Sequence, residues 1–308
     1  MSAITLKQLK YFAAVAEYGH FGRAAEACSI SQPALSIQVR DLEATLGVRL
    51  LERGPRRLTV TRFGETFLER TLEILRSVNE LSDLARMEQA QLGGRLRLGV
   101  IPTIGPYLLP RLIAQLDKAY PTLDLEVRET LTQQLIAELN SGQLDVALVA
   151  LPISEPALEE HALFSEPLVL VRPKQSAPET LPPTLAHPDM LKNQRLLLLE
   201  EGHCFRDQAL EFCTLGGRLG PQGLNASSLS TLVQMVGAGL GVTLLPQMAV
   251  AVETAAAPVS TAHFVETEPT RSIGLVWRKT NPLARQLKEL APLVIAAAET
   301  PLPPADRS

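Results

Sequence analysis

Apolar residues recur at helical spacing through the first eighteen residues, and Gly19 ends that pattern. The segment 21–28 is rich in alanine, which predicts a second, short helix that a neighbour can approach closely. Ser31 then stands at an N-cap position, and Pro33 falls in the first turn, where its missing N–H is harmless. The pattern therefore predicts three helices, of which the third begins at Ser31.

The third predicted helix has two different faces. Its apolar face is formed by Leu35, Val39 and Leu42. A polar stripe with members four residues apart is formed by Gln32, Ser36 and Arg40. A buried apolar face together with an outward hydrogen-bonding face is typical of the second helix of a DNA-binding helix–turn–helix.

Residues 51–62 predict a two-stranded wing that turns at Gly54 and Pro55. The arginines of this segment are Arg53, Arg56, Arg57 and Arg62. Taken alone, they are equally compatible with a solvated basic loop. Directly after a helix–turn–helix, they favour contact with the phosphates of DNA.

Residues 63–90 predict a long amphipathic helix. Its seven-residue apolar repeat consists of Phe67, Ile74 and Leu81, with Val78 and Ala85 at the intervening spacing. Thr71 interrupts the repeat. Such a repeat is more typical of a dimerisation helix than of a core helix, and a dimer suits two-fold DNA sites.

Strand and helix patterns alternate along the rest of the chain. The order over 95–150 is strand, helix, strand, helix, strand, which predicts a parallel sheet. Further strands are expected at 167–173, 195–201, 241–246 and 272–278, and further helices at 228–238 and 282–298.

The predicted fold class is α/β, with a winged helix–turn–helix and a long linker helix before a two-lobed effector domain similar to periplasmic binding proteins. The expected divisions are 1–62 for the DNA-binding domain, 63–92 for the linker and dimerisation helix, and 93–300 for the effector domain. Within the last, lobe I takes 93–166 and 272–300, and lobe II takes 167–271. A ligand cleft is expected between the lobes at the strand ends, and the Pro-rich tail 301–308 is expected to be disordered.

Charge is distributed unevenly along the chain. Residues 1–62 carry nine Lys and Arg against five Asp and Glu, whereas the remainder carries 20 basic and 28 acidic residues. A basic N-terminal segment followed by an acidic remainder favours a polyanion-binding domain joined to a domain with a different function.

The composition also limits the expected cellular location of the protein and the kinds of cofactor it could use. The chain has only three cysteines, which predicts a cytoplasmic protein. It has no apolar run of eighteen residues and no apolar N-terminal stretch, so neither a membrane span nor a secretory signal is expected. The absence of CxxC and HExxH motifs gives no reason to expect a metal, and we expect no cofactor.

The segment 21–53 resembles the DNA-binding region of the LysR-type transcriptional regulators; it reads FGRAAEACSISQPALSIQVRDLEATLGVRLLER. The resemblance continues through the linker helix and the α/β body to GAGLGVTLLP at 237–246. It implies a homotetramer of winged-helix dimers that binds promoter DNA and contacts RNA polymerase. On matching positions, it places Ser31, Gln32, Pro33 and Ser36 in the major groove and Arg53 near phosphate.

Three further segments, 101–110, 199–213 and 271–278, are similar to the peroxide-sensing regulators of that family. This resemblance implies that a Cys204 thiolate attacks hydrogen peroxide to give a sulfenic acid, which Cys213 resolves as a disulfide. Nine residues of continuous helix span ~13.5 Å, whereas a disulfide needs Cα atoms within about 7 Å. The bond would therefore require the intervening segment to unwind, so that oxidation changes the conformation and activates transcription.

The same resemblance implies roles for the neighbours of Cys204. His203 and Arg206 would supply hydrogen bonds and positive charge, together with the dipole of a helix starting near residue 206. Arg271 is similar to a more distant cation that supports the thiolate. The remaining candidates are Thr103 and Thr132, whose hydroxyls would position peroxide, and Asp207, which would assist proton movement.

Other functions remain open on the residues alone. A regulator of the same fold could sense a small metabolite in the cleft, and a thiol peroxidase with an accessory DNA-binding head would use the same cysteine. Buried cysteines are also commonly structural. Cys28, which lies next to the third predicted helix, is interpreted as core packing.

Overall fold

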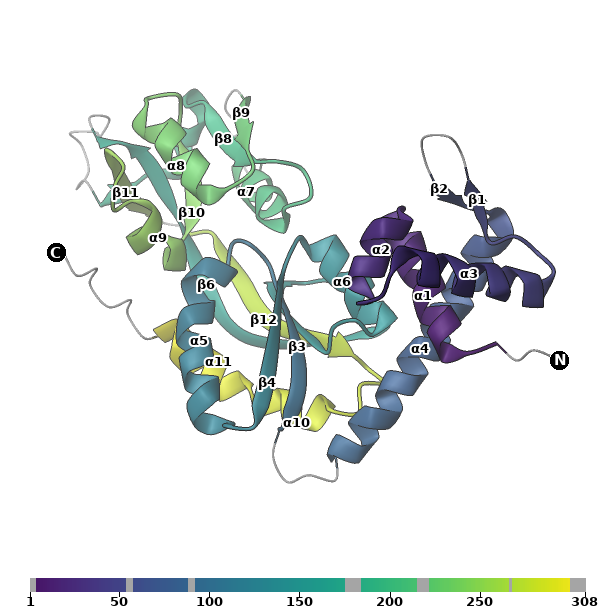
Figure 1. The fold of residues 1–308 in the computed structure, drawn as a ribbon. Coiled ribbons are helices and arrows are strands. Elements are labelled where there is room, and N and C mark those ends of the chain that lie inside the picture. The colour runs from purple at the N-terminus through teal and green to yellow at the C-terminus, as the bar shows by residue number, and fades with distance from the viewer. Residues whose placement is uncertain are drawn as a thin grey trace. The chain divides into compact units, whose positions relative to one another are not determined.

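The computed structural model describes residues 4–53, 58–87, 92–174, 184–214, 222–265 and 268–299. The chain forms two compact units, Met1–Ala85 and Arg86–Ser308 (Figure 1). Within the described ranges, no helix combines the length and apolar character needed to cross a membrane.

The first unit contains the expected winged helix–turn–helix. Its elements are α1 Leu6–Tyr18, α2 Phe21–Ala27, α3 Gln32–Leu46, β1 Leu51–Arg53, β2 Leu58–Val60 and α4 Arg62–Met87. Thr5 and Gln8 form a capping box at the start of α1, and Gly19 ends it in the left-handed conformation. The Ser31 hydroxyl accepts a hydrogen bond from the Ala34 N–H, so the predicted cap is confirmed.

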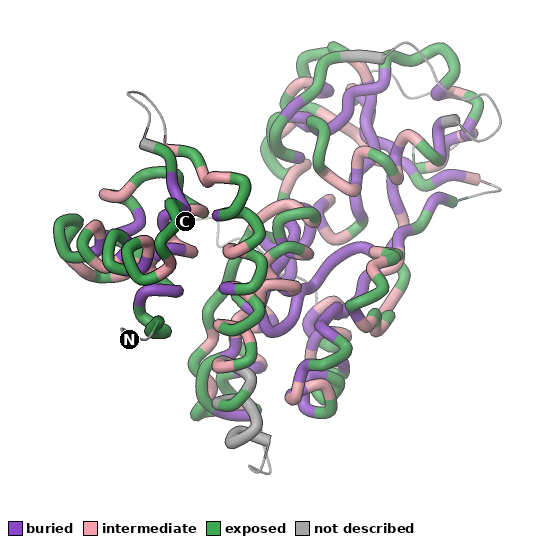
Figure 2. Tube along the Cα trace, turned by 90° about the vertical axis from the view of Figure 1, so that its right-hand side faces the viewer, coloured by how far each residue is buried: buried purple, intermediate pink, exposed green. Residues whose placement is uncertain are grey.

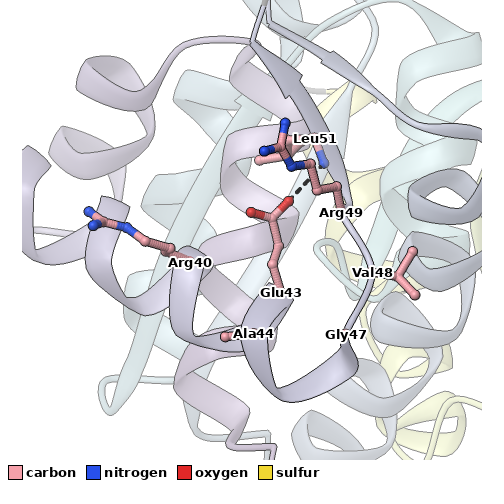
Figure 3. A pocket seen from close by; sticks show the side chains of 7 residues that line it. All are labelled: Arg40, Glu43, Ala44, Gly47, Val48, Arg49 and Leu51. Carbon is pink, nitrogen blue, oxygen red and sulfur yellow. Dashed lines mark hydrogen bonds between the residues drawn. The ribbon is translucent and has the colours of Figure 1, made fainter.

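The apolar face predicted for α3 is confirmed, because Leu35, Val39 and Leu42 are fully buried in the core of the first unit. The Glu43 carboxylate accepts the N–H groups of Leu50 and Leu51 at 2.8 and 3.1 Å, which anchors β1 to α3. Figure 3 shows Glu43 beside Leu51. The wing is thereby held in a fixed position against the helix that precedes it.

The predicted repeat of α4 divides into buried and exposed positions. Phe67 packs on the Phe12 ring at 5.7 Å and belongs to the core of its own unit, and Thr71 is buried. Ile74 and Leu81 are instead 46% and 66% exposed. Figure 2 colours the whole trace by burial class. The exposed part of the apolar repeat therefore has no cover within the described chain.

The second unit begins with the alternating elements that the sequence predicts. They are β3 Gly94–Val100, α5 Gly105–Ala119, β4 Leu123–Glu129, α6 Thr132–Ser141 and β5 Val146–Leu151. Strand β3 pairs in parallel with both β4 and β5, so the predicted parallel sheet is confirmed. Because the strands are parallel, the loops that enter α5 and α6 emerge at the same edge of the sheet.

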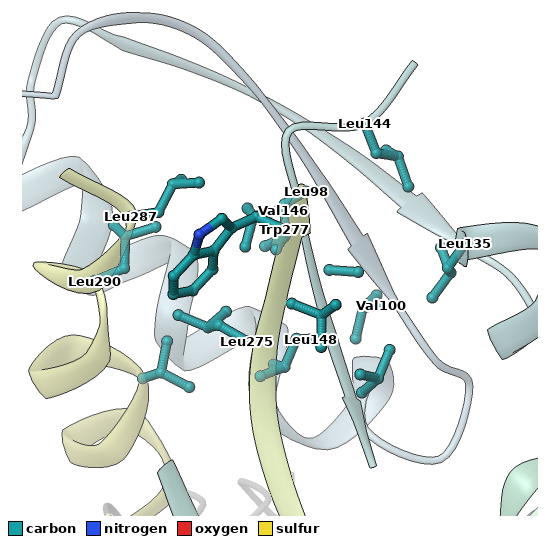
Figure 4. Close-up of a cluster of buried hydrophobic side chains, with 14 of the residues drawn as sticks. Leu98, Val100, Leu135, Leu144, Val146, Leu148, Leu275, Trp277, Leu287 and Leu290 are labelled. Atoms are coloured by element: carbon teal, nitrogen blue, oxygen red, sulfur yellow. The ribbon is translucent and has the colours of Figure 1, made fainter. Parts of the chain in front are cut away.

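Two long strands join the lobes of this unit. Strand β6, Leu158–Pro173, pairs over residues 158–167 with β12, Thr270–Arg278, and over residues 168–173 with β10, Thr243–Pro246, and β11, Val259–Phe264. The two lobes have separate apolar cores: one lies around Trp277, Leu148 and Leu287 (Figure 4), and the other around Leu197, Phe205 and Val233. The two-lobed α/β architecture is therefore confirmed.

The remaining elements mostly build the second lobe. They are β7 Leu185–Ala186, a 3₁₀ helix Pro188–Asn193, β8 Leu196–Leu199, α7 Cys204–Thr214, β9 Gln222–Ala226, α8 Leu229–Gly237 and α9 Gln247–Glu253; α10 Ala284–Lys288 and α11 Ala291–Glu299 follow β12. The prediction of one helix over 282–298 was wrong. Pro292 lies in the first turn of α11, where its ring excludes a helical carbonyl four residues earlier, so the helix breaks and restarts.

Candidate functional site

Cys204 lies at the start of α7, where the chain leaves the buried strand β8. The turn between them includes Gly202, whose φ of +96° is readily adopted only by glycine. The helix begins at Cys204 itself and not near residue 206, so the half-buried thiol occupies the helix N-terminus.

A narrow, closely packed pocket lies beside this thiol. Its walls are Ile101, Pro102, Thr103, Leu131, Thr132, His203, Cys204 and Phe205. These residues come from the segments that enter α5, α6 and α7, so three helices begin at or next to one pocket. Helix N-termini carry partial positive charge, which favours an anion such as a thiolate.

Thr103 is held at the pocket by Arg271. The guanidinium Nη1 donates to the Thr103 hydroxyl at 2.8 Å, and Nη2 donates to the Thr103 carbonyl at 3.0 Å. Arginine has only donors, so the Thr103 oxygen is the acceptor and its own proton is left to donate elsewhere. The structure thus brings two predicted site residues, Thr103 and Arg271, into direct contact.

Thr132 contributes a second hydroxyl to the pocket. Gln208 on α7, which was not predicted and does not line the pocket, carries a further buried side-chain oxygen. The buried oxygens of both side chains have no hydrogen-bond partner in the described chain. A buried polar atom without a partner is costly, so such atoms mark places that a ligand or water can satisfy. Gln208 follows Cys204 by four residues in α7, and this i,i+4 spacing was the available signal.

Replacing Thr132 with valine is expected to slow the reaction of Cys204 with hydrogen peroxide by about tenfold, the value of one lost hydrogen bond. The melting temperature should stay the same or rise, because the variant removes an unpaired buried oxygen without changing the side-chain volume. Stopped-flow measurement of thiol loss gives the rate of the reaction, and a thermal unfolding curve gives the melting temperature. Thr71→Val is the matched control: it removes an unpaired buried hydroxyl from the other unit and should leave the rate unchanged.

The other predicted neighbours of Cys204 are placed differently. Burial lowers the pKa of His203, although Glu200 opposes this, so the neutral imidazole is favoured over the expected cation. The Arg206 guanidinium donates to the Leu199 carbonyl at 2.7 Å and to Asn225 at 3.0 Å, which directs it toward β8 and β9. Asp207 is exposed and, like Arg206, is not among the pocket residues.

Cys213 lies near the end of α7 and is fully buried in the core of the second lobe. No disulfide joins Cys204 to Cys213 in this structure. Continuous helix from one to the other corresponds to ~13.5 Å of rise. The two sulfur atoms therefore cannot bond while α7 remains helical.

The predicted DNA-contacting residues gather on α3 of the first unit. Most of them are exposed, namely Ser31, Gln32, Pro33 and Arg40, and Ser36 is half-buried. They form a polar face, whereas the other face of α3 is apolar and buried. The structure describes the backbone of Arg53 but not its side chain, and Arg56 and Arg57 lie outside the described residues. Cys28 is half-buried against the core, as predicted, and burial raises the pKa of its thiol.

Comparison with family models accounts for both units. Residues 6–65 match the bacterial regulatory helix–turn–helix proteins of the lysR family, and residues 89–298 match the LysR substrate binding domain. The chain belongs to the LysR family. The resemblance that the sequence carries at 21–53 and 237–246 is therefore confirmed.

Individual relatives of this LysR-family chain cover almost its whole length. A hydrogen peroxide-inducible genes activator from Dickeya chrysanthemi is 42% identical over 288 residues, which cover 94% of each chain. A full-length cysteine-to-aspartate variant of OxyR from Pseudomonas aeruginosa has a similar structure, with a TM-score of 0.74 and 36% identity over 96% of this chain and 95% of that one. The hydrogen-peroxide-bound structure of a cysteine-to-serine variant of OxyR from Corynebacterium glutamicum has a TM-score of 0.66 and 36% identity, covering 96% and 93%.

Proposed function

We propose that this LysR-family regulator senses hydrogen peroxide at Cys204 and, once oxidised, activates transcription of oxidative-stress genes. The observation that carries the proposal is the position of Cys204: a half-buried thiol at a helix N-terminus, in a pocket that also holds the Thr103 and Thr132 hydroxyls. The names of the relatives support the same assignment, because one is a peroxide-inducible activator and another binds hydrogen peroxide.

The proposed chemistry needs two steps. The Cys204 thiolate attacks one oxygen of hydrogen peroxide, the O–O bond breaks, and hydroxide leaves as Cys204 sulfenic acid forms. The Cys213 sulfur then attacks the Cys204 sulfur, and the hydroxyl group leaves with a proton as water. Thr103 and Thr132 would position the peroxide oxygens, and Asp207 would assist proton movement once α7 begins to move.

The narrowness of the pocket favours peroxide over a metabolite. Sites for drug-sized ligands usually enclose about 300–1,000 Å³, whereas the residues around Cys204 pack closely and leave no room for such a ligand. Hydrogen peroxide has two oxygens, each of which needs a hydrogen-bond partner, and the pocket offers hydroxyls for this purpose. A metabolite-sensing regulator remains the alternative outcome of the test below.

For the first unit, we propose that α3 enters the major groove of promoter DNA and that the basic wing contacts phosphate. Its DNA-contacting residues would be Ser31, Gln32, Pro33, Ser36, Arg40, Arg53, Arg56 and Arg57. The exposed Ile74 and Leu81 of α4 support a homodimer through this helix, and two dimers would form a homotetramer that contacts RNA polymerase. We also propose that the protein acts in the cytoplasm, where it reaches chromosomal DNA, and that it is a regulator and not an enzyme; the lysR-family helix–turn–helix supports this proposal.

One equivalent of hydrogen peroxide is expected to convert Cys204 and Cys213 to a disulfide in the purified protein. Trypsin places the three cysteines on separate peptides, 24–40, 196–206 and 207–218. Mass spectrometry without reduction should therefore find 196–206 joined to 207–218, with Cys28 still alkylatable. Two intact thiols in 196–206 and 207–218 would contradict the proposal, and repeated peroxide turnover with a reductant would indicate a peroxidase instead.

A further inference from the structure

Glu166 links Arg271, which holds Thr103 at the pocket, to the start of α9. It lies on β6 directly opposite Arg271 of β12, and its Oε2 accepts the Arg271 Nε–H at 2.7 Å. Its other oxygen, Oε1, accepts the N–H of Met248 at the start of α9 at 2.6 Å. The side chains of Arg271 and Glu166 are 0% and 5% exposed, so water screens neither charge appreciably.

This pairing affects the electrostatic potential at Cys204. Arg271 contacts the pocket through Thr103 and also lies 5.6 Å from the centre of the Phe205 ring, next to the thiol in the chain. A lone buried cation there would strongly favour a thiolate. The paired Glu166 carboxylate opposes that effect, because a unit negative charge lies within hydrogen-bonding distance of the guanidinium.

We propose that Glu166 sets the sensitivity of the sensor by offsetting the charge of Arg271, which keeps Cys204 less reactive than the cation alone would make it. This inference rests on the proposed function. Glu166 touches neither peroxide nor sulfur, so it is a positioning residue: it fixes the guanidinium against Thr103 and limits its field. A sensor with such a residue reacts more slowly at a given peroxide concentration than one whose buried cation has no offset.

Other charged groups also surround the thiol and must stay constant in a test. On α7 and the turn before it they are Glu200, Glu201, His203, Arg206 and Asp207; from β4, Glu129 contacts Gly105 at the start of α5. His203 is the member that titrates near neutral pH, and burial lowers its pKa. None of these groups bonds to Glu166 among the described contacts, so changing Glu166 leaves their hydrogen bonds in place.

The test is the pH profile of Cys204 alkylation by iodoacetamide, read from the tryptic peptide 196–206 of the full-length protein. In E166Q the midpoint should fall by about one pH unit, because the amide keeps the shape and removes the opposing charge. At a pH below the midpoint, the rate of the Cys204 reaction with peroxide should be about threefold higher in E166Q than in the wild type. About tenfold more thiolate is present, but each thiolate is less nucleophilic because its pKa is lower. An unchanged or higher midpoint in E166Q would overturn the proposal.

E166Q leaves an unpaired buried cation, which can impair folding, so a double variant gives an independent test. E166Q/R271Q removes both charges together, and an offset pair predicts a midpoint within about 0.3 pH units of the wild type. A rise of about one unit in the double variant would mean that the Arg271 charge acts without an offset, and the proposal would fail.

Asp145→Asn is the matched control for the loss of a buried carboxylate. Asp145 pairs with Arg97 at 2.6 Å within the same unit and does not line the pocket, so its loss should leave the midpoint unchanged. The alkylation profile needs no peroxide. A wild-type Cys204 that ignores peroxide would therefore refute the proposed function while the profile still decides the role of Glu166.

Discussion

Replacing Cys204 with serine is expected to abolish the response to peroxide completely. A serine hydroxyl is not ionised at neutral pH and cannot form a sulfenic acid, so no oxidised state is available to the protein. The fold should tolerate the change, because Cys204 is only half-buried and serine is similar in size. DNase I footprints of the purified variant, with and without peroxide, should be identical, and induction of a reporter gene should fall to the uninduced level.

Cys28→Ser is the matched control for that experiment. Cys28 is also half-buried, and burial raises the pKa of its thiol, which keeps it protonated and unreactive. The control variant should therefore respond to peroxide like the wild type. A Cys204→Ser protein that still changes its footprint with peroxide would instead assign sensing to another group, and a response to a metabolite alone would favour the alternative function.

The elements that the sequence predicted well are those fixed by local signals. Gly19 and Ser31 act on neighbouring backbone groups, so the ends of α1 and α3 depend little on the rest of the fold. The apolar run of β5 is buried on both faces, as expected of a strand in the middle of a sheet, where β5 pairs with β3 and β12. The strand β9 was missed because its sequence, QGLNA, carries no apolar alternation.

The missed strand also explains why part of the site could not be predicted. The Arg206 guanidinium donates a hydrogen bond to Asn225 on β9. Because β9 was not predicted, Arg206 was expected to lie beside the thiol instead. Glu166 and Arg271 are 105 residues apart and meet only because β6 pairs with β12. Nothing in the sequence near Glu166 distinguishes it from a surface carboxylate, and its role depends on the sheet register.

The helix α7 is expected to unwind when the disulfide forms. Closing a ten-residue ring restricts the unfolded segment by ~2.7 kcal/mol in the loop-entropy model. Unwinding instead exposes Phe205 and Phe212, which are 2% and 7% exposed, and burial of each such side chain is worth ~1.5–3 kcal/mol. Phe212 also lies 5.1 Å from Phe264 on β11, which fixes the end of the helix. The lost chain entropy adds to these costs, so the free energy of oxidation by peroxide must drive the change and reduction must reverse it.

Amide hydrogen exchange measures this transition directly. In the reduced protein, the amides of α7 should be protected by their helical hydrogen bonds; after one equivalent of peroxide, that protection should fall at least tenfold across 205–213 and return with dithiothreitol. Cys213→Ala separates the two chemical steps, because Cys204 still forms a sulfenic acid but has no partner sulfur. Its α7 should remain protected after peroxide, since a sulfenic acid at the first residue requires no unwinding. An oxidised wild type that carries the 204–213 disulfide and keeps full protection of α7 would contradict the geometry, because ~13.5 Å of helix cannot be spanned by one disulfide.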